Sequence, residues 1–471
     1  MSTHLVNVDR DTPLLLPQDM REWVPDDDLV NFVIEAIKGM KLGSLKVNVR
    51  GSGSDQYPPR MMLMLLVYCY SQGQFSSRRI ERATYRDISV RVLTANTHPD
   101  HDTICTFRRQ NFDLVAEVFL EVLKLAKELG ILKVGTVSLD GAHVQANASK
   151  HKSVSYERAG ELESQLKLDI AGLMAKAEEM DNQKIDEGHK LPESIAHREE
   201  LMKKMAAARK QLEERAKARS EAEKAAYDKE KAERQERRDN DDPPQNGNPR
   251  SPSKPEPRAK ESINLTDPDS RLMRKTRNSA YSQSYNAQAV VDAEGSMLIL
   301  AAAVTQNAND STQLERMIHA VDPQIGKPST VLADTGYADA DRMERLEKEG
   351  MELFIAVRKG DNQGQRRYDY RLTSMLEKAK IEAQIPPKDP RLAKMQEKLR
   401  TPEGRKKYNK RKETVEPVFG VIKAAMGFRQ CLMRGIEKVS GEWSLVTLAY
   451  NFRRLWNLKK RQMAQTVPQV A

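Results

Sequence analysis

The sequence predicts an α+β protein of several domains, in which a mixed sheet with helices is interrupted by an inserted helical hairpin and preceded by an all-α region. The chain has 471 residues, more than one hydrophobic core usually holds. Short β-branched segments alternate with helical ones in its second half, and one similar segment lies much earlier. A long, densely charged helical stretch separates that earlier segment from the later ones.

The N-terminal part is predicted to be helical after a short arm. Residues 1–19 have the composition of an extended arm, and residues 20–133 carry apolar side chains at helical spacing, as from Val30 to Ile37. The segment from Met61 to Tyr70 is almost continuously apolar and follows two prolines. That pattern fits a buried helix whose first turn contains proline.

Arginines on the later helices of this region suggest a nucleic-acid partner. Asp102 is predicted to cap a helix that bears Arg108 and Arg109. Short helices joined by tight turns favour a helix-turn-helix-like DNA-binding region, in which these two arginines contact DNA. An ordinary helical bundle with solvated arginines is the alternative interpretation.

Residues 134–154 are expected to begin the mixed sheet. The segment from Val134 to Leu139 is β-branched and apolar, and it stops at Asp140. Residues 155–238 then predict a helical hairpin with a coiled-coil seam, and residues 239–262 predict a flexible linker rich in Pro, Asn and Ser. The first arm of the hairpin repeats apolar residues at spacings of three and four: Leu162, Leu166, Ile170 and Leu173.

Residues 263–461 are expected to complete the sheet and to end in basic helices, followed by a tail at 462–471. A β-hairpin is predicted between Tyr285 and Thr305. The next elements, in order, are a helix near 311–321, a strand at 330–333 ending at Asp334, a helix near 339–349, a strand from Leu353 to Val357, and helices from about residue 370.

Without the inserted hairpin, the element order is three strands followed by alternating helices and strands, which is the order of a ribonuclease H-like fold. Such a sheet brings the end of its first strand beside the end of its fourth, so Asp140 and Asp334 are expected to be neighbours. A later helix can add Glu416. Three carboxylates suit two Mg²⁺ ions, which Mn²⁺ can replace, because hard cations take oxygen ligands. Two such ions can activate an attacking oxygen and stabilise the leaving one, which is the chemistry of phosphodiester cleavage.

Charge and composition narrow the compartment and the partner. The net charge of +10 and the isoelectric point of about 9.2 favour a polyanion. The three cysteines, Cys69, Cys105 and Cys431, are far apart and predict neither a zinc site nor a disulfide framework. No apolar stretch is long enough for a membrane helix and the start lacks a signal peptide, so a cytoplasmic protein associated with the nucleoid is expected.

Four motifs resemble those of bacterial insertion-sequence transposases of the DDE type, in the broad IS-four-like superfamily and specifically its "eleven-eighty-two" family. The resemblance covers nearly the whole chain. The motifs are LDGAHVQANASKHK at 139–152, NLTDPDSRLMRK with SYNAQAVVD across 264–292, VLADTGYADADRMERLEKEG at 331–350, and KRKETVEPVFGVIK at 410–423 followed by RGIEKVSGEWSLVTLAYNFRRL at 434–455.

The resemblance implies which residues form the site. Asp140, Asp334 and Glu416 would be the catalytic, metal-binding acids. The superfamily signature has Tyr, two residues, Arg, three residues, Glu, six residues and Lys; here Glu416 and Lys423 have the expected separation. Seven residues make two helical turns, so Lys423 would share a face with Glu416 and contact a DNA phosphate. Glu413, the rival acid, lies at the wrong distance from Lys423.

The residues before this glutamate depart from the signature. Four residues rather than three separate Arg411 from Glu416. Either Lys412 takes the place of the arginine, or the turn before the helix has one extra residue. The resemblance implies that Tyr408, Arg411 and Lys412 bind the DNA backbone, and the departure leaves their individual roles open.

The resemblance thus implies a transposase that binds the terminal inverted repeats of an insertion sequence, cuts there and joins the ends to target DNA. Because two ends are joined at once, a homodimer on DNA is expected, with no membrane partner. The first alternative is a catalytically inactive, transposase-derived DNA-binding regulator. A structural coiled-coil protein is the second, but it leaves the strand-terminal aspartates and the basic C-terminal region unexplained.

Overall fold

The structure is a computed structural model that describes residues 19–45, 56–183, 191–239, 251–274, 278–358 and 387–466. Its chain divides into two compact units. Unit 1 contains Met1–Lys133, Val421–Phe428 and Ser444–Ala471, and unit 2 contains Val134–Gly420 and Arg429–Trp443. The expected arm falls outside the described residues except for Asp19. The expected assignment of 263–461 to the catalytic core differs from this division, because most of the last helix groups with the N-terminal helices.

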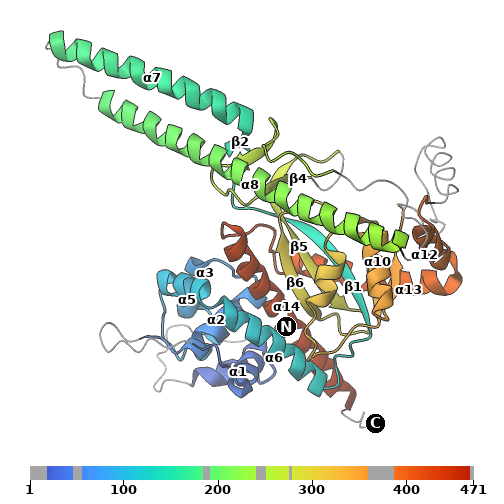
Figure 1. Cartoon of the computed structure of the whole chain (residues 1–471). Coiled ribbons are helices and arrows are strands. Elements are labelled where there is room, and N and C mark those ends of the chain that lie inside the picture. The colour runs from blue at the N-terminus through green and yellow to red at the C-terminus, as the bar shows by residue number, and fades with distance from the viewer. Residues whose placement is uncertain are drawn as a thin grey trace, which may run out of the picture. The chain divides into compact units, whose positions relative to one another are not determined.

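Unit 1 is helical, as the sequence predicts (Figure 1). Pro59 occupies the first turn of α2, whose side chains from Met62 to Ser71 are all buried. Phe32 meets Phe452 of the last helix, with ring centroids 6.2 Å apart. The helices are α1 (Leu29–Gly39), α2 (Pro59–Ser71), α3 (Ser77–Arg86), α4 (Ile88–Leu93), α5 (His101–Gln110), α6 (Phe112–Glu128) and the later part of α14 (Ile436–Thr466), after a short turn η1 (Met20–Trp23).

The start of α5 differs from the prediction. Asp100, not Asp102, caps this helix, because its side chain accepts the N–H of Thr103 at 2.6 Å. The helix therefore begins at His101, and Asp102 lies exposed in its first turn. An acidic side chain in either place is favourable near the positive end of a helix, so composition alone does not separate the two positions.

Unit 2 contains a mixed sheet in the order β6-β5-β1-β7-β8, with the short β4 (Arg271–Met273) also pairing with β5. The order is that of a ribonuclease H-like sheet. Strand β1 is antiparallel to β5 and parallel to β7, and β7 is parallel to β8. The five main strands are β1 (Thr136–Gln145), β5 (Ser282–Asp292), β6 (Ile299–Thr305), β7 (Thr330–Ala333) and β8 (Glu352–Ile355).

The helices of unit 2 follow the predicted alternation. Helix α9 (Leu314–His319) precedes β7, and α10 (Ala340–Lys348) lies between β7 and β8. Two further helices, α12 (Pro390–Arg400) and α13 (Pro402–Gly420), come after β8, and α13 packs against β1, β5, β7 and β8. A helix laid across these strands places its side chains beside the sheet edge, which positions the candidate site.

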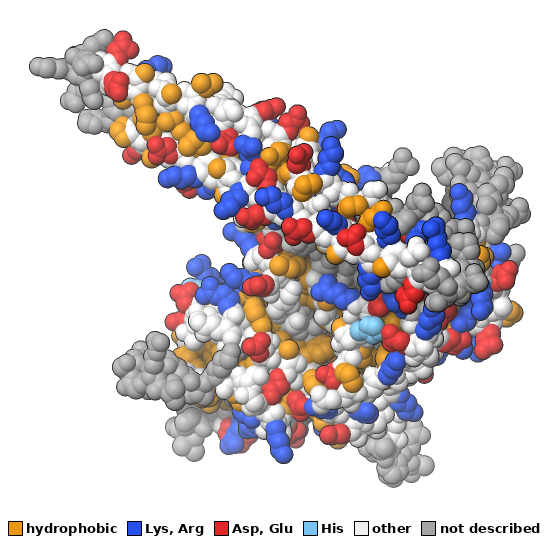
Figure 2. Space-filling model, in the orientation of Figure 1, with side chains coloured by type: hydrophobic (Ala, Val, Ile, Leu, Met, Phe, Trp, Pro, Cys, Tyr) orange, Lys and Arg blue, Asp and Glu red, His pale blue; other side chains and the backbone are white. Residues whose placement is uncertain are grey.

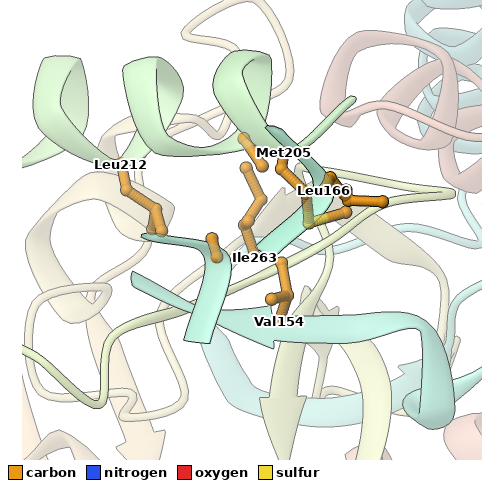
Figure 3. Packing of buried hydrophobic residues seen from close by; sticks show 7 residues of the cluster. Val154, Leu166, Met205, Leu212 and Ile263 are labelled. Atoms are coloured by element: carbon orange, nitrogen blue, oxygen red, sulfur yellow. The ribbon is translucent and has the colours of Figure 1, made fainter. Parts of the chain in front are cut away.

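The inserted hairpin consists of α7 (Tyr156–Gln183) and α8 (Leu191–Asp239), which run side by side (Figure 1). Its base includes a two-stranded sheet of β2 (Ser153–Ser155) and β3 (Ser262–Asn264). Apolar side chains from both helices and both strands pack there (Figure 3). The fully or largely buried members are Val154, Ala159, Leu166, Met205, Ala208, Leu212 and Ile263.

The expected flexible linker at 239–262 is described only from residue 251, apart from Asp239 at the end of α8. Its described part is fastened to α8. Glu223 accepts the backbone N–H and the hydroxyl of Ser253 at 2.7 and 2.6 Å. Arg219 donates to both carboxylate oxygens of Glu261. This part of the segment therefore follows the helix instead of forming a free tether.

The hairpin base should depend on the fully buried Leu212. Leu212→Ala is expected to reduce the free energy of unfolding by about 2–5 kcal/mol, because it removes buried methyl groups and leaves a cavity. Chemical denaturation followed by circular dichroism measures the change. Leu168→Ala is the matched control on α7, where the leucine is 75% exposed, and it should change stability by less than about 0.5 kcal/mol. Equal losses in the two variants would contradict the packing described.

Candidate active site

The first two acids lie beside each other at the point where the pairing of β1 with β7 ends. Leu139 and Ala333 form the last parallel pair between β1 and β7, and both are fully buried. Asp140 and Asp334 are the next residues on their strands, so both follow that pair at the same edge. This register places the two aspartates next to each other, as the sequence predicts.

Asp140 is not at the end of its strand, contrary to the prediction. Strand β1 continues to Gln145 because its other edge stays paired with β5, from Asp140 opposite Ala289 to Gln145 opposite Ser284. Only the pairing with β7 stops at this point. Asp334, by contrast, follows the end of β7 and caps the short turn η4 (Thr335–Tyr337) by accepting the N–H of Thr335.

The third acid reaches the same place from α13. The guanidinium of Arg411 contacts all three carboxylates: Nη1 lies 3.3 Å from Oδ2 of Asp140, and Nη2 lies 2.8 Å from Oε1 of Glu416 and 4.0 Å from Oδ2 of Asp334. Arg411 and Glu416 are five residues apart on α13. One side chain therefore joins a strand, the end of a second strand and a helix.

Arg411 is the most enclosed member of this group. Its side chain is 9% exposed, against 21% for Asp140, 49% for Asp334 and 48% for Glu416. Burial opposes its charge, but the surrounding acids and Tyr408 raise the pKa of the guanidinium above its ordinary value. The Arg411 Nε has no hydrogen-bond partner among the described residues. The side chain is thus held by its charge contacts with the acids.

The environment of Asp140 disfavours its ionised form. Burial raises the pKa of this carboxyl to about 6, and the nearby Asp334 and Asp310 add to the rise. Arg411 and the N–H of Gly141, which donates at 2.9 Å, act in the opposite direction. Partly buried like charges at close range are costly unless a cation is present, so this edge of the sheet is built to hold positive charge.

The donor set fits a hard divalent cation. All three acids offer carboxylate oxygens, the ligands that Mg²⁺ and Mn²⁺ prefer, and they already converge on one positive group. Within the described ranges, however, no three acidic, histidine or cysteine side chains are close enough to hold an ion as they stand. The guanidinium lies between them, so an ion bound by all three would replace contacts to Arg411.

Sequence reasoning missed a polar group behind these acids. The buried side chains of Asn286 and Gln288 on β5 each donate to Oδ1 of Asp310 at 2.7 Å. The hydroxyl of Tyr337 in turn donates to Oε1 of Gln288. Asp310 lies in a polar loop, where aspartate is common, so its sequence position carries no signal. The available sequence signal for this polar group was a pair of amide side chains, two residues apart, in a predicted strand.

The polar group explains the glycine after Asp140. A Cβ atom at Gly141 would lie 2.9 Å from Oδ1 of Asp310 and 3.0 Å from Oδ1 of Asn286, closer than side chains tolerate. The same Asp310 lies against Gly336, two residues after Asp334, where a Cβ would be 3.3 Å from Oδ2. Glycine at both places lets the polar group approach β1 beside Asp140 and the turn η4 beside Asp334.

The other predicted site residues divide into buried and exposed ones. Tyr408 is buried, and its ring centroid lies 5.9 Å from the Arg411 guanidinium carbon. Lys412 is exposed on α13. Lys423 lies in the π-helical turn η5 (Val421–Ala425), so the α-helical argument that it shares a face with Glu416 does not extend to it. It also belongs to unit 1, whereas the three acids belong to unit 2.

The two arginines of α5 have different surroundings. Arg108 is buried, and its Nη1 donates to the Tyr70 hydroxyl at 2.8 Å and to the Phe75 carbonyl at 2.9 Å. This burial disfavours the expected DNA contact of Arg108, because its guanidinium holds α5 against the end of α2 and the turn that follows. Arg109 is exposed.

The acids of the segment Asp267-Pro268-Asp269 have a structural position. Asp267 is fully buried, accepts the Tyr285 hydroxyl at 2.9 Å and accepts the N–H of Gly435 at 3.1 Å. Asp269 accepts the N–H of Ile436 at 3.1 Å. Both carboxylates thus bind backbone N–H groups at the start of α14, where negative charge is favourable.

A ribonuclease H-like sheet whose first and fourth strands bring aspartates to one edge, joined by a glutamate from a later helix, defines a class of enzymes that cut and join nucleic acid. Family models agree. The transposase DDE domain matches residues 258–452, and the Transposase domain (DUF772) matches residues 18–110. The chain belongs to the DDE transposases of bacterial insertion sequences.

The family match includes two of the three acids of the site. Asp334 and Glu416 lie within the matched DDE domain, whereas Asp140 lies before it, because the hairpin is inserted after β1. Strand pairing supplies Asp140 independently. No curated protein and no solved structure matches the chain. Among the described helices, none is long and apolar enough to cross a bilayer.

The raised pKa of Asp140 should make stability depend on pH. Because its pKa rises from 3.8 to about 6 on folding, the folded protein binds this proton more tightly than the unfolded chain. The free energy of unfolding should therefore fall as pH rises from about 4 to about 6. Asp140→Asn should lack that fall and exceed the wild type above about pH 7 by roughly 1–3 kcal/mol, measured by chemical denaturation. The same pH profile in both proteins would argue against the buried carboxyl.

Gly141→Ala should damage the site with little loss of secondary structure. The added methyl group must displace Asp310, Asn286 or Gln288, which changes the surroundings of Asp140. We expect at least about a hundredfold loss of DNA cleavage, since displacements near 1 Å have that effect on catalysis. Gly172→Ala on α7, where nothing lies within 4 Å of the added atom, is the control and should cleave normally. Normal cleavage by Gly141→Ala would show that the polar group does not constrain the site.

Proposed function

We propose that this transposase binds the terminal inverted repeats of its insertion sequence and catalyses metal-dependent cleavage of DNA and transfer of the cut strand. One observation carries the proposal. Carboxylates from β1, from the end of β7 and from α13 converge on the guanidinium of Arg411. Three carboxylates that already surround one cationic group are suited to hold divalent cations, whose charge stabilises the oxygens of a phosphodiester during cleavage.

Asp140, Asp334 and Glu416 would hold two Mg²⁺ ions, which Mn²⁺ can replace. When bound, such ions activate the attacking oxygen and stabilise the leaving oxygen. The residues of the chain itself set the geometry: the last pair of the β1–β7 ladder fixes the two aspartates, and α13 carries the glutamate. The partly exposed Asp334 and Glu416 face solvent, where a DNA strand can approach.

Arg411 would serve as the counter-ion of the three acids when no metal ion is bound. It keeps the carboxylates close together by neutralising their mutual repulsion. Replacement of its contacts by metal ions would free the guanidinium to bind a DNA phosphate, which is the role that the sequence motif implies for Arg411. Tyr408 lies beside it and steadies its position.

The remaining basic residues are proposed to bind the DNA backbone. Lys412 is exposed on the same helix as Glu416, and Lys423 follows in η5. Arg109 is the exposed arginine of α5 in unit 1. Contacts of this kind set the position of a duplex without reading its sequence. Two transposon ends must be joined together, so the active form is proposed to be a homodimer on DNA, with the α7–α8 hairpin contributing to assembly.

The direct test uses variants of two of the three carboxylates, Glu416 on α13 and Asp334 at the end of β7. Glu416→Gln and Asp334→Asn should each abolish nicking of a labelled duplex that carries the terminal repeat, with a loss of about a thousandfold or more in Mg²⁺. Glu413→Gln is the matched control, because Glu413 is exposed on the same helix one turn earlier. It should nick at the wild-type rate.

The outcomes separate the enzyme from the regulator. If the wild type binds the repeat but neither it nor any variant nicks DNA in Mg²⁺ or Mn²⁺, the chain is a DNA-binding regulator descended from a transposase. Loss of nicking in Glu413→Gln with activity retained in Glu416→Gln would show that Glu413, and not Glu416, is the third acid. Filter binding at fixed salt measures retention of DNA by each variant, since affinity depends strongly on ionic strength.

A further inference from the structure

Helix α3 presents a single exposed basic face. Arg78, Arg79, Arg82 and Arg86 are all exposed, and so is Tyr85, at 58%. At 100° per residue, these five positions span about 120° of the helix circumference. Figure 2 shows Lys and Arg side chains over the place that α3 occupies in Figure 1. The face is continuous along the helix and belongs entirely to unit 1.

The opposite face of α3 anchors the helix. Ile80, Ala83 and Thr84 are buried, and the helix packs against α2, α4 and α5. Two histidines fasten it further: His98 Nδ1 lies 3.2 Å from the Thr84 hydroxyl, and His101 Nδ1 lies 2.9 Å from Glu81 Oε2. A rigid helix that offers one face can bind a partner with little ordering of its own backbone.

The arginines of this face lack acidic partners. Among the described residues, none of Arg78, Arg79, Arg82 and Arg86 forms an ion pair. The one acid on the helix, Glu81, is engaged by His101. Other basic side chains are neutralised within the protein, as where Arg391 pairs with Asp341, Glu344 and Asp389. Four unpaired charges on one helical face favour a polyanionic partner, because binding then releases counterions.

Tyr85 adds a flat surface to the basic face. Its ring stacks on His98, with centroids 3.9 Å apart and planes at 11°. The stack fixes the orientation of an exposed aromatic ring beside Arg82 and Arg86. Such a ring can contact the sugar-phosphate backbone or a thymine methyl group, whereas arginines can form paired hydrogen bonds with guanine.

We infer that α3 is the helix that enters the major groove of the terminal-repeat DNA, and that Arg78, Arg82 and Tyr85 are its central contacts. This inference rests on the proposed function and assigns its DNA-reading surface. A helix of ten residues is about 15 Å long and fits the groove. The rival is α5, but Arg108 is buried there, which leaves Arg109 as the exposed arginine of the pair.

The test compares two double variants of the full-length protein. The probe is a labelled duplex copied from the DNA that flanks the coding sequence, with a scrambled duplex of the same composition beside it. Arg78→Gln with Arg82→Gln should weaken binding to the flanking duplex at least about tenfold and reduce its preference over the scrambled one. Lys38→Gln with Lys41→Gln removes the same charge from exposed positions in unit 1 and should change both affinities equally and slightly.

The outcomes distinguish a failure of terminal-repeat recognition from a failure of the assignment of α3. If the wild type binds neither duplex better than the other, the proposed recognition of terminal repeats fails. If the wild type prefers the flanking duplex and the α3 variant keeps that preference, the inference about α3 is wrong. A loss confined to Arg109→Gln would move the reading helix to α5. Circular dichroism of each variant confirms that the exposed substitutions leave the helices intact, and Tyr85→Ala provides a second, uncharged probe of the same face.

Discussion

The contact between Arg411 and three carboxylates is the interaction on which the candidate site depends. It connects the first strand of the sheet, the end of the fourth and the helix α13, which are separated by the inserted hairpin and by long stretches of sequence. Without a cation among them, Asp140, Asp334 and Glu416 would repel one another. The fold therefore brings the acids together, and the guanidinium offsets the repulsion between their charges.

Different parts of the structure around this contact stabilise different features of the site. The parallel pairing of β1 with β7 fixes the two aspartates in register. The polar group of Asn286, Gln288 and Asp310 fills the space against Gly141 and Gly336. The hairpin has its own apolar core, at β2 and β3. The long insertion between β1 and β5 therefore leaves the pairing of these two strands intact. In unit 1, buried contacts hold α3 rigid while its arginines stay exposed.

Much of the fold followed from periodicity and turn residues, because β-branched runs and helical repeats are local signals. Strand β7 and helix α2 lie almost where their residues predict. The cap of α5 at Asp100 is a local difference, but two others concern non-local partners. Asp140 is inside β1 because β5 continues to pair with it, and the buried Arg108 donates hydrogen bonds to the Tyr70 hydroxyl and the Phe75 carbonyl. The contacts of Asp310, and those of Arg411 with Asp140 and Asp334, join residues far apart in the chain, and sequence spacing does not predict such contacts.

The proposed chemistry requires that the three acids exchange one guanidinium for divalent metal ions. Crystals of the protein soaked in Mn²⁺ and measured at the manganese absorption edge test it most directly. We expect anomalous density within about 2.0–2.3 Å of oxygens of Asp140, Asp334 and Glu416, with the Arg411 guanidinium moved away from them. Manganese bound elsewhere, or Arg411 still contacting all three carboxylates in saturating Mn²⁺, would contradict it.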